Sequence, residues 1–305
     1  MLDVSVLFTV FNRPDTTQVV FERIRQAKPR KLFLAADGPR PNKDGEKEKC
    51  DEVKRIVSNV DWDCDVYTLF REENLGSGKA LSSAITWFFS HVEMGIILED
   101  DCLPDVSFFS FCKDVLEFYK DEEKVMHVSG GNLQCGIKRG SASYYLSKLP
   151  STWGWATWRR AWKRYSFVFF EDSDDEIKKV LTRTLKDEEY VNYFFNEFEK
   201  TKAHVVDAWD YQWVYTLFKY DAICVTPQYS LIRNIGFNSR GTHTFYAPFW
   251  YKYLIYKPAG KFEPVKGIEL FDKADDFYLT LTMGKRSFEV LLVKLLFKIK
   301  NFSTK

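Results

Sequence analysis

The chain has 305 residues, of which 45% are hydrophobic and 17% aromatic, enough to bury the core of one large domain. Lys and Arg total 44 and Asp and Glu total 43, and this balance argues against a nucleic-acid-binding protein, which would usually carry a basic excess. The six Cys form no CxxC pair, no signal peptide is recognisable, and no apolar run approaches the roughly 20 residues of a transmembrane helix. These features predict a cytoplasmic protein with reduced thiols.

The first 130 residues alternate between strand and helix patterns. Apolar, β-branched runs predict strands over Val4–Phe11, Lys31–Ala36, Val66–Phe70, Gly95–Leu98 and Val125–Ser129. Amphipathic patterns predict helices over about 15–27 (capped by Asp15), 45–59, 79–91 and 106–119. Strands that alternate with single helices predict an α/β fold with a mostly parallel central sheet and helices on both faces.

The second half is more aromatic and less regular. It predicts helical segments over about 174–200 and 209–220, a short strand over 222–227, and a glycine-bearing loop over 234–244. The stretch 287–302 is apolar and contains Lys294, Lys298 and Lys300, which predicts a basic amphipathic helix. Two alternatives stay open for 285–302: peripheral contact with the inner face of the cell membrane, or packing against the domain or a second subunit.

Two phosphate-binding motifs are incomplete. The first predicted strand is followed by FNRP, which lacks the glycines of the dinucleotide-binding fingerprint. GSGKA at 76–80 is similar to the end of a P-loop, but Glu73 stands where the first glycine belongs and Ala80 replaces the Ser or Thr. Both a classical dinucleotide-dependent oxidoreductase and a P-loop ATPase therefore lose support.

Three adjacent carboxylates, Glu99, Asp100 and Asp101, follow the fourth predicted strand. The carboxyl ends of strands in open α/β sheets are where ligands bind. Neighbouring negative charges repel, so the triplet favours a bound cation. A hard cation such as Mn²⁺ or Mg²⁺ takes one or two carboxylates and completes its coordination with phosphate oxygens and water. The triplet therefore predicts a metal–diphosphate site.

The triplet lies in LEDDCLPDVSFFSF, which resembles the metal-binding motif of GT-A-fold glycosyltransferases, most closely the N-acetylglucosaminyltransferase I type. Further blocks follow the family's order over roughly 1–245: VLFTVFNRP, FLAADGPR, STWGWATWRRAW, VVDAWDYQWVYTLF and AICVTPQYSLIRNIGFNSRGTHT. The resemblance implies a Rossmann-like GT-A domain over 1–245, with a nucleotide-sugar half over about 1–130 and an acceptor half over about 131–245. Residues 246–305 would form a C-terminal extension that contains the basic amphipathic helix.

The resemblance also implies roles for individual residues. It implies that the metal is bound by Asp101 and His243. It implies that the nucleotide sugar is contacted by Thr9, Phe11, Arg13, Asp37, Asn74, Glu99 and Asp100. It implies that the acceptor or sugar is contacted by Trp153, Gly154 and Trp155. It implies that Asp210 is the catalytic base.

A carboxylate within hydrogen-bond reach can remove the proton of an attacking sugar hydroxyl. Trp209 and Trp213 could form an apolar wall that raises the pKa of Asp210. Asp207 competes for the same role, and either Asp could instead cap the following helix.

The activity that the resemblance implies is that of a hexosyl- or N-acetylhexosaminyltransferase. It would use Mn²⁺ or Mg²⁺ and move a sugar, with inversion, from a nucleotide-diphosphate donor to a glycan or lipid-linked glycan. UDP is the expected nucleotide. One alternative is a sugar-nucleotide nucleotidyltransferase, which normally needs a glycine-rich loop with Arg or Lys after the first strand. The other is a non-catalytic carbohydrate-binding protein, which would leave the acidic triplet unexplained.

Overall fold

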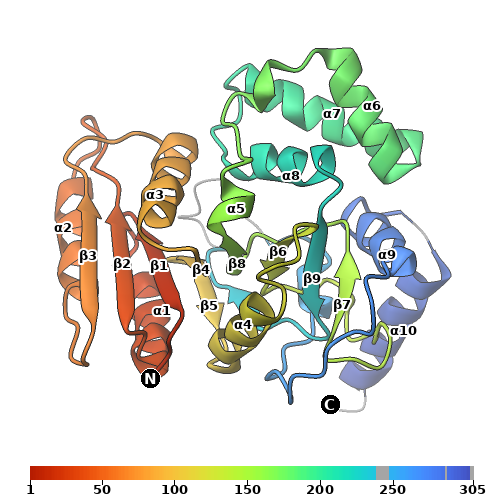
Figure 1. The fold of residues 1–305 in the computed structure, drawn as a ribbon, viewed down its shortest axis with the longest axis horizontal. Helices are drawn as coiled ribbons and strands as arrows, with labels where there is room; N and C mark the ends of the chain where they lie inside the picture. The colour runs from red at the N-terminus through yellow and green to blue at the C-terminus, as the bar shows by residue number, and fades with distance from the viewer. Residues whose placement is uncertain (238–246, 286, 303–305) are drawn as a thin grey trace.

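The computed structural model describes residues 1–237, 247–285 and 287–302, and its centre is an eight-stranded sheet (Figure 1). The strand order is β3-β2-β1-β4-β8-β6-β9-β7. Six of these strands run in one direction, and β8 and β7 run against them. A separate two-stranded ribbon pairs β10 with β5. The predicted α/β class with a mostly parallel sheet is confirmed.

The strands of the structure are β1 (Ser5–Val10), β2 (Lys31–Ala36), β3 (Asp65–Phe70), β4 (Met94–Glu99), β5 (Cys102–Pro104), β6 (Val125–Ser129), β7 (Tyr144–Ser147), β8 (Trp155–Trp158), β9 (Ile223–Pro227) and β10 (Ile232–Asn234). The helices are α1 (Pro14–Ala27), α2 (Glu46–Val57), α3 (Ser77–His91), α4 (Ser107–Phe118), α5 (Arg159–Trp162), α6 (Asp174–Leu185), α7 (Glu188–Lys202), α8 (Asp210–Lys219), α9 (Asp272–Thr282) and α10 (Phe288–Phe302). Two short 3-10 turns lie at Phe169–Glu171 and Tyr251–Tyr253.

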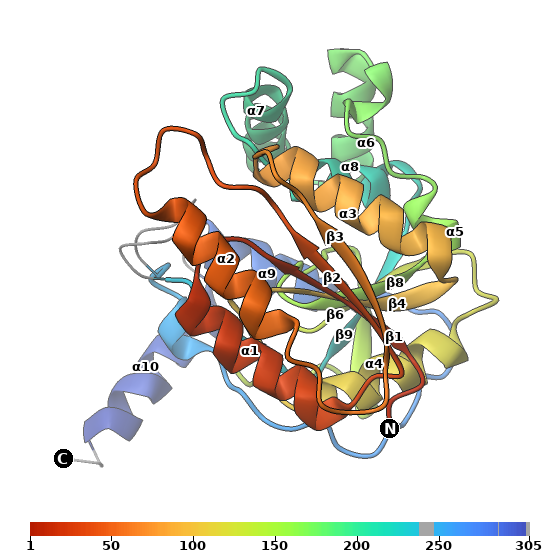
Figure 2. The ribbon, with the colours of Figure 1, turned by 90° about the vertical axis from the view of Figure 1, so that its left-hand side faces the viewer.

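Both faces of the sheet are covered, as the alternation of strand side chains requires (Figure 2). On one face, Val6 and Phe8 of β1 pack in a core with α1, α2 and α4. On the other face, Leu7 of β1 packs in a core with α3, α5 and α8. Every residue of β1 is buried, as predicted for a strand in the middle of a two-sided sheet.

The order of the strands fixes where a ligand can bind. The chain leaves β1 for β2 and β3 on one side and returns as β4 on the other side of β1. This reversal opens a crevice beyond the carboxyl ends of β1 and β4. The acidic triplet begins at the last residue of β4, so the fold places it at this crevice.

Several local predictions need correction. Helix α1 begins at Pro14, and no side chain caps it, so Asp15 lies in the first turn and does not cap it. The predicted helical stretch 174–200 is two helices, α6 and α7, which turn at Lys186 and Asp187. The strands β7 and β8 were not predicted; aromatic residues at helical spacing hid β8.

The C-terminal segment packs closely on the rest of the chain. The amide of Phe271 donates to the carbonyl of Leu146 in β7 at 2.8 Å. Helix α9 contributes Leu279 to the core of α6, α7 and α8. A further core joins α9, α10 and Leu133. The segment predicted as an extension therefore completes two cores of the protein.

Two predictions about the chain as a whole can be compared with the structure. All six Cys are described, and none is in a disulfide. Within residues 1–237, 247–285 and 287–302, no helix combines the length and the hydropathy needed to cross a bilayer.

Candidate active site

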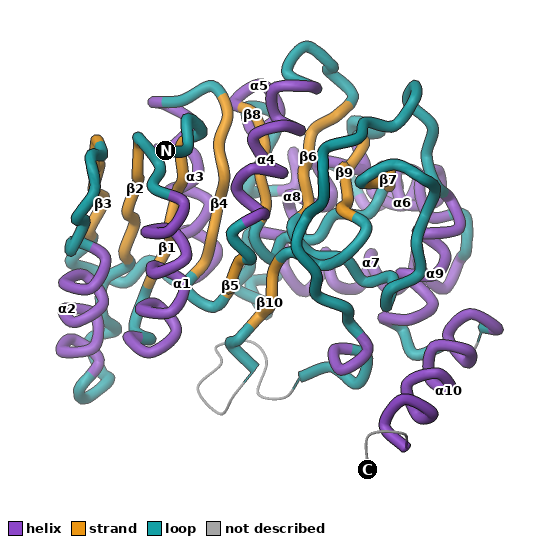
Figure 3. Tube along the Cα trace, turned by 90° about the horizontal axis from the view of Figure 1, so that it is seen from below, coloured by secondary structure: helices purple, strands orange, loops and turns teal. Residues whose placement is uncertain are grey.

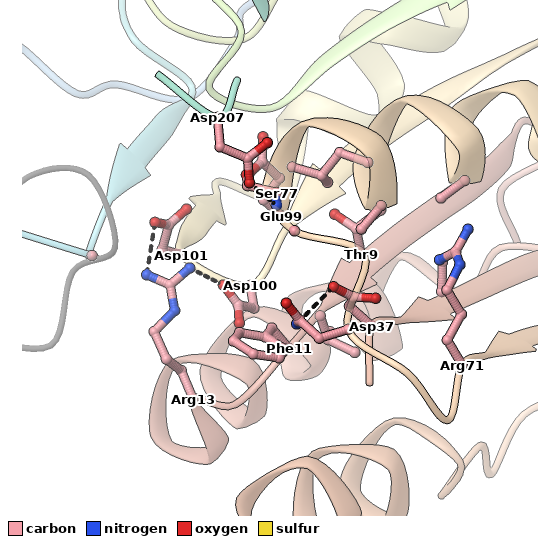
Figure 4. Close-up of a pocket in the computed structure, with 18 of the residues that line it drawn as sticks. Thr9, Phe11, Arg13, Asp37, Arg71, Ser77, Glu99, Asp100, Asp101 and Asp207 are labelled. Atoms are coloured by element: carbon pink, nitrogen blue, oxygen red, sulfur yellow. Dashed lines mark hydrogen bonds and ion pairs between the residues drawn. The ribbon is translucent and has the colours of Figure 1, made fainter. Parts of the chain in front are cut away.

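A cavity of about 340 Å³ lies at the carboxyl ends of β1, β2 and β4, beside the start of α3 (Figure 4). Its volume falls in the range of small-molecule sites in proteins, about 300–1,000 Å³. Eight of the predicted site residues line it: Thr9, Phe11, Arg13, Asp37, Asn74, Glu99, Asp100 and Asp101. The structure thus brings together residues that are up to 92 positions apart, from Thr9 to Asp101.

The acidic strand end, Glu99–Asp101, shares one cation. Arg13 donates from Nη1 to Oδ2 of Asp101 at 3.0 Å and from Nη2 to Oδ1 of Asp100. Asp100 is only 2% exposed, whereas Asp101 is 17% exposed and faces the cavity. Among the residues that the structure describes, three carboxyl groups therefore meet one guanidinium, an excess of acidic over basic groups.

This excess displaces the acid equilibria of the strand end. Burial raises the pKa of Glu99 well above its usual value, and the negative charges of Asp101, Asp210 and Asp100 raise it further. Burial also raises the pKa of Asp100 to about 6, although the Arg13 cation opposes the shift. A further positive charge at this strand end would relieve the repulsion and lower both pKa values.

The second strand ends in a carboxylate of a different kind. Asp37 is buried and accepts hydrogen bonds from Nδ2 of Asn74 at 2.9 Å and from the amide of Leu75 at 3.1 Å. Burial raises the pKa of Asp37, and the hydrogen bonds from the backbone oppose that shift. These contacts hold the Asp37 carboxylate in one orientation at the wall of the cavity. The same hydrogen bond orients the Asn74 amide.

Asp207 caps helix α3 from a distance of 130 residues. Its carboxylate accepts from the amides of Ser77 at 2.7 Å and Gly78 at 2.9 Å. A Cβ on Gly76 or Gly78 would lie 2.6–2.7 Å from the Asp207 carboxylate, so only glycine admits this contact. The GSG sequence that resembles a P-loop therefore receives a carboxylate of the same chain at the helix N-terminus.

Asp210 is the first residue of α8, where Trp209 is the cap position and no side chain caps the helix. Its negative charge raises the pKa of Glu99, but among the described residues it is Asp207, and not Asp210, that lines the cavity. Of the two carboxylates that compete for the base role, Asp207 is engaged by α3, and Asp210 is the one electrostatically coupled to Glu99.

The residues predicted to contact the acceptor do not line the cavity. Trp155 is 1% exposed and stacks on Trp209 inside the core, so in this structure its indole is a core side chain. Gly154 has φ of 57° and lies against Ile232 and Leu98, which gives it a packing role. Trp153 packs edge-on against Phe237 and Tyr251. His243 lies outside the described residues.

Two arginines that were not predicted also line the cavity, Arg40 and Arg71. Arg40 is paired with Glu46, and Arg71 donates to Ser83 at 2.9 Å and senses the charge of Asp37. Arg71 directly follows β3. The rule that ligands bind beyond the carboxyl ends of the strands therefore predicts Arg71 as a site residue as well.

The acidic strand end fits a hard divalent cation by the chemistry of its donors. Its donor atoms are carboxylate oxygens, and acidic groups outnumber basic ones among its described residues. Oδ1 of Asp101 accepts from the Cys102 thiol, a weak donor, at 3.4 Å. Among the described residues no group of three or more His, Cys, Asp or Glu is arranged as a complete ligand set.

The sequence matches no protein-family model and no curated protein. Among solved structures, the chain is similar to a 4-diphosphocytidyl-2C-methyl-D-erythritol synthase from Anaerococcus prevotii, with 10% identity and a TM-score of 0.37 over 76% of this chain and 92% of that one. It is also similar to the glycosyltransferase GlyE of Streptococcus pneumoniae, with 11% identity and a TM-score of 0.33 over 98% of this chain and 64% of that one. A UDP-glucose pyrophosphorylase in complex with UDP-glucose has 11% identity and a TM-score of 0.26 over 48% of this chain and 62% of that one.

Proposed function

We propose that this protein is a metal-dependent GT-A glycosyltransferase that moves a sugar from a nucleotide-diphosphate donor, UDP-linked, to a hydroxyl of a glycan or glycolipid. One observation carries the proposal: an acidic strand end opens on a cavity at the crevice of the sheet, and the charge of a further carboxylate, Asp210, acts on Glu99 of that strand end. Such a site fits a donor whose diphosphate arrives with a divalent cation.

In this proposal Asp101 holds Mn²⁺ or Mg²⁺, and the cation would stabilise the negative charge of the departing diphosphate. Arg13 would contact the diphosphate, and before the donor binds its guanidinium pairs with Asp100 and Asp101. The Asp37 carboxylate and the Asn74 side-chain amide hold each other in place and would form hydrogen bonds with the nucleoside. Asp210 takes the proton of the acceptor hydroxyl as that hydroxyl attacks the sugar on the face opposite the departing diphosphate. The reaction is then a single displacement with inversion.

The nucleotidyltransferase alternative is less well supported. Such an enzyme would hold a nucleoside triphosphate on a glycine-rich loop after β1, but here β1 and α1 are joined by only Phe11, Asn12 and Arg13. None of these is a glycine. Arg13 is the only cation within this short connection, and it already pairs with two carboxylates.

The test combines binding and turnover. Thermal unfolding would be followed with UDP-, GDP- and CMP-sugars, each with and without Mn²⁺. We expect a rise in melting temperature with UDP-sugars that requires the metal, because a ligand that binds the native state raises its stability. Release of UDP from the stabilising donor would then be measured, with water or added glycans as acceptor.

EDTA should abolish both the thermal shift and the release of UDP. Full activity in EDTA would remove the metal from the proposal. Release of pyrophosphate from a nucleoside triphosphate and a sugar phosphate would instead establish a nucleotidyltransferase. Glycan binding without any turnover of a donor would establish a non-catalytic carbohydrate-binding protein.

A further inference from the structure

Helix α10 exposes a continuous apolar stripe. Phe288 is 79% exposed, Leu291 52%, Leu292 41% and Leu295 55%. Their spacing of three, four and seven residues places them on one face of the helix. Phe249, which is 46% exposed, lies beside the same helix, because Nζ of Lys294 is 5.3 Å from the centre of its ring. Leaving this much apolar surface in water is costly, so it indicates a binding partner.

The opposite face of α10 is fixed to the protein, so the direction of the stripe is fixed too. Val290 is 1% exposed and Val293 is 8% exposed, and both belong to a core with α9 and Leu133. The Glu289 carboxylate pairs with the buried guanidinium of Arg139 at 2.8 Å. The apolar stripe is therefore the outward face of a helix that is docked by its inward face.

The charges around the stripe point to an anionic partner. Helix α10 contains Lys294, Lys298 and Lys300 but a single acid, Glu289, whose charge is neutralised by Arg139. Lys294 forms no ion pair with any described residue. It lies one helical turn from the exposed Leu291 and is the chain neighbour of the exposed Leu295. A helix with a bulky apolar face and lysines beside it is suited to the boundary between lipid headgroups and acyl chains.

The position of α10 agrees with such a surface. Figures 2 and 3 show α10 projecting past the body of the protein on the side toward which β1 and β4 run with their carboxyl ends. The cavity lies at those strand ends. Helix α10 therefore lies toward the side of the sheet that carries the cavity.

We propose that the exposed apolar stripe of α10, with Lys294 beside it, is the surface by which this protein docks on an anionic lipid bilayer. The helix would lie in the plane of the interface, with Phe288, Leu291, Leu292 and Leu295 toward the acyl chains and Lys294 toward lipid phosphates. The inference goes beyond the proposed function and does not depend on it, since it concerns a surface outside the cavity.

The test is flotation of the full chain with two kinds of vesicle: phosphatidylcholine alone, and phosphatidylcholine mixed with phosphatidylglycerol. We expect binding to the mixed vesicles that weakens at high salt, because salt screens the lysines. The variant Leu291→Asp/Leu295→Asp should lower the vesicle partition coefficient at least about tenfold, since two apolar side chains leave the bilayer. Its melting temperature should match the wild type, because both positions are exposed.

The matched control is Val168→Asp/Val205→Asp, which places the same charges at exposed apolar positions, 62% and 73% exposed, outside α10. This control should float like the wild type. Failure of the wild type to bind the mixed vesicles would overturn the proposal, and so would equal binding by the α10 variant. A wild type that is dimeric in solution and an α10 variant that is monomeric, with no flotation of either, would make the stripe an interface between copies.

Discussion

Two regions of the molecule hold ionisable groups with displaced pKa values, but for different reasons. One is the acidic strand end, and the other is a core of tryptophans on the face of the sheet covered by α3, α5 and α8. The tryptophan core, Trp155, Trp162, Trp209 and Trp213, surrounds His127, which is fully buried. Burial lowers the pKa of His127 to about 3. Its Nε2–H donates to the carbonyl of Ser151 at 3.1 Å, and its Nδ1 accepts from the indole of Trp213 at 3.2 Å.

The histidine is therefore satisfied as a neutral ring, with a hydrogen bond at each nitrogen. At the acidic strand end, three carboxyl groups and one guanidinium are described, and the group opens on a cavity. The comparison teaches that a displaced pKa indicates a functional site only when the group also meets a cavity and lacks charge balance.

The largest effect is expected from Asp101→Ala. If the strand end holds a catalytic cation, the variant should lose metal-dependent transfer by roughly a thousandfold or more, because stabilisation of the leaving diphosphate is removed. The measurement is UDP release with saturating Mn²⁺. Asp65→Ala is the control, since Asp65 is an exposed carboxylate at the amino end of β3, whereas the cavity lies at the carboxyl ends of the strands. Unchanged metal-dependent turnover in Asp101→Ala would remove Asp101 from the site.

Asp210→Asn should lower kcat by roughly a hundredfold or more, because the amide cannot accept the acceptor's proton. The metal-dependent thermal shift with the donor should persist, which separates this role from donor binding. Asp221→Asn, just past the other end of α8, is the control. Loss of the thermal shift together with the activity would assign Asp210 to binding instead.

His127→Ala should lower the free energy of unfolding by about 2–4 kcal/mol. The substitution leaves a cavity and removes partners from the Ser151 carbonyl and the Trp213 indole. Urea titration at neutral pH measures the loss, and the Mn²⁺-dependent thermal shift of the folded variant should be unchanged. A loss of donor binding at wild-type stability would make His127 part of the site and would contradict the distinction.

The smallest effect is a change in pH dependence. Because the pKa of His127 is lowered on folding, the unfolded chain binds the extra proton below the usual pKa of about 6.5, and stability falls as the pH drops toward about 3. The slope from this one group reaches about 1.4 kcal/mol per pH unit. His127→Gln, which cannot titrate, should show a correspondingly shallower fall in urea titrations below neutral pH. Equal slopes would mean that another group controls the acid transition.

The residues predicted from the first half and from the second half fared differently. Those of the first half follow strands, and the carboxyl ends of parallel strands meet at one edge of a sheet, so Arg13, Asp37, Asn74 and Asp101 line one cavity. The second half offers no such rule. Trp155 was predicted to contact the acceptor or sugar. It lies in the antiparallel strand β8, and its indole is in the core.

Some contacts could not be predicted because they join distant segments. The ion pairs of Arg13 with Asp100 and Asp101 span 87 and 88 positions, and the cap of α3 by Asp207 spans 129 and 130. Which carboxylate caps a helix and which acts on Glu99 depends on how α8 is placed against α3. Periodicity along the chain carries no information on that placement.

The sequence by itself determined the α/β class, the parallel first half of the sheet and the strand ends at which polar side chains gather, because hydrophobic periodicity and the handedness of crossovers act locally. Only the tertiary structure decided that Arg13 balances two of the three acids, that Asp207 serves α3, and that α10 presents its apolar stripe outward. Those outcomes depend on which surfaces meet and which groups lose their water. That is a property of the packed chain.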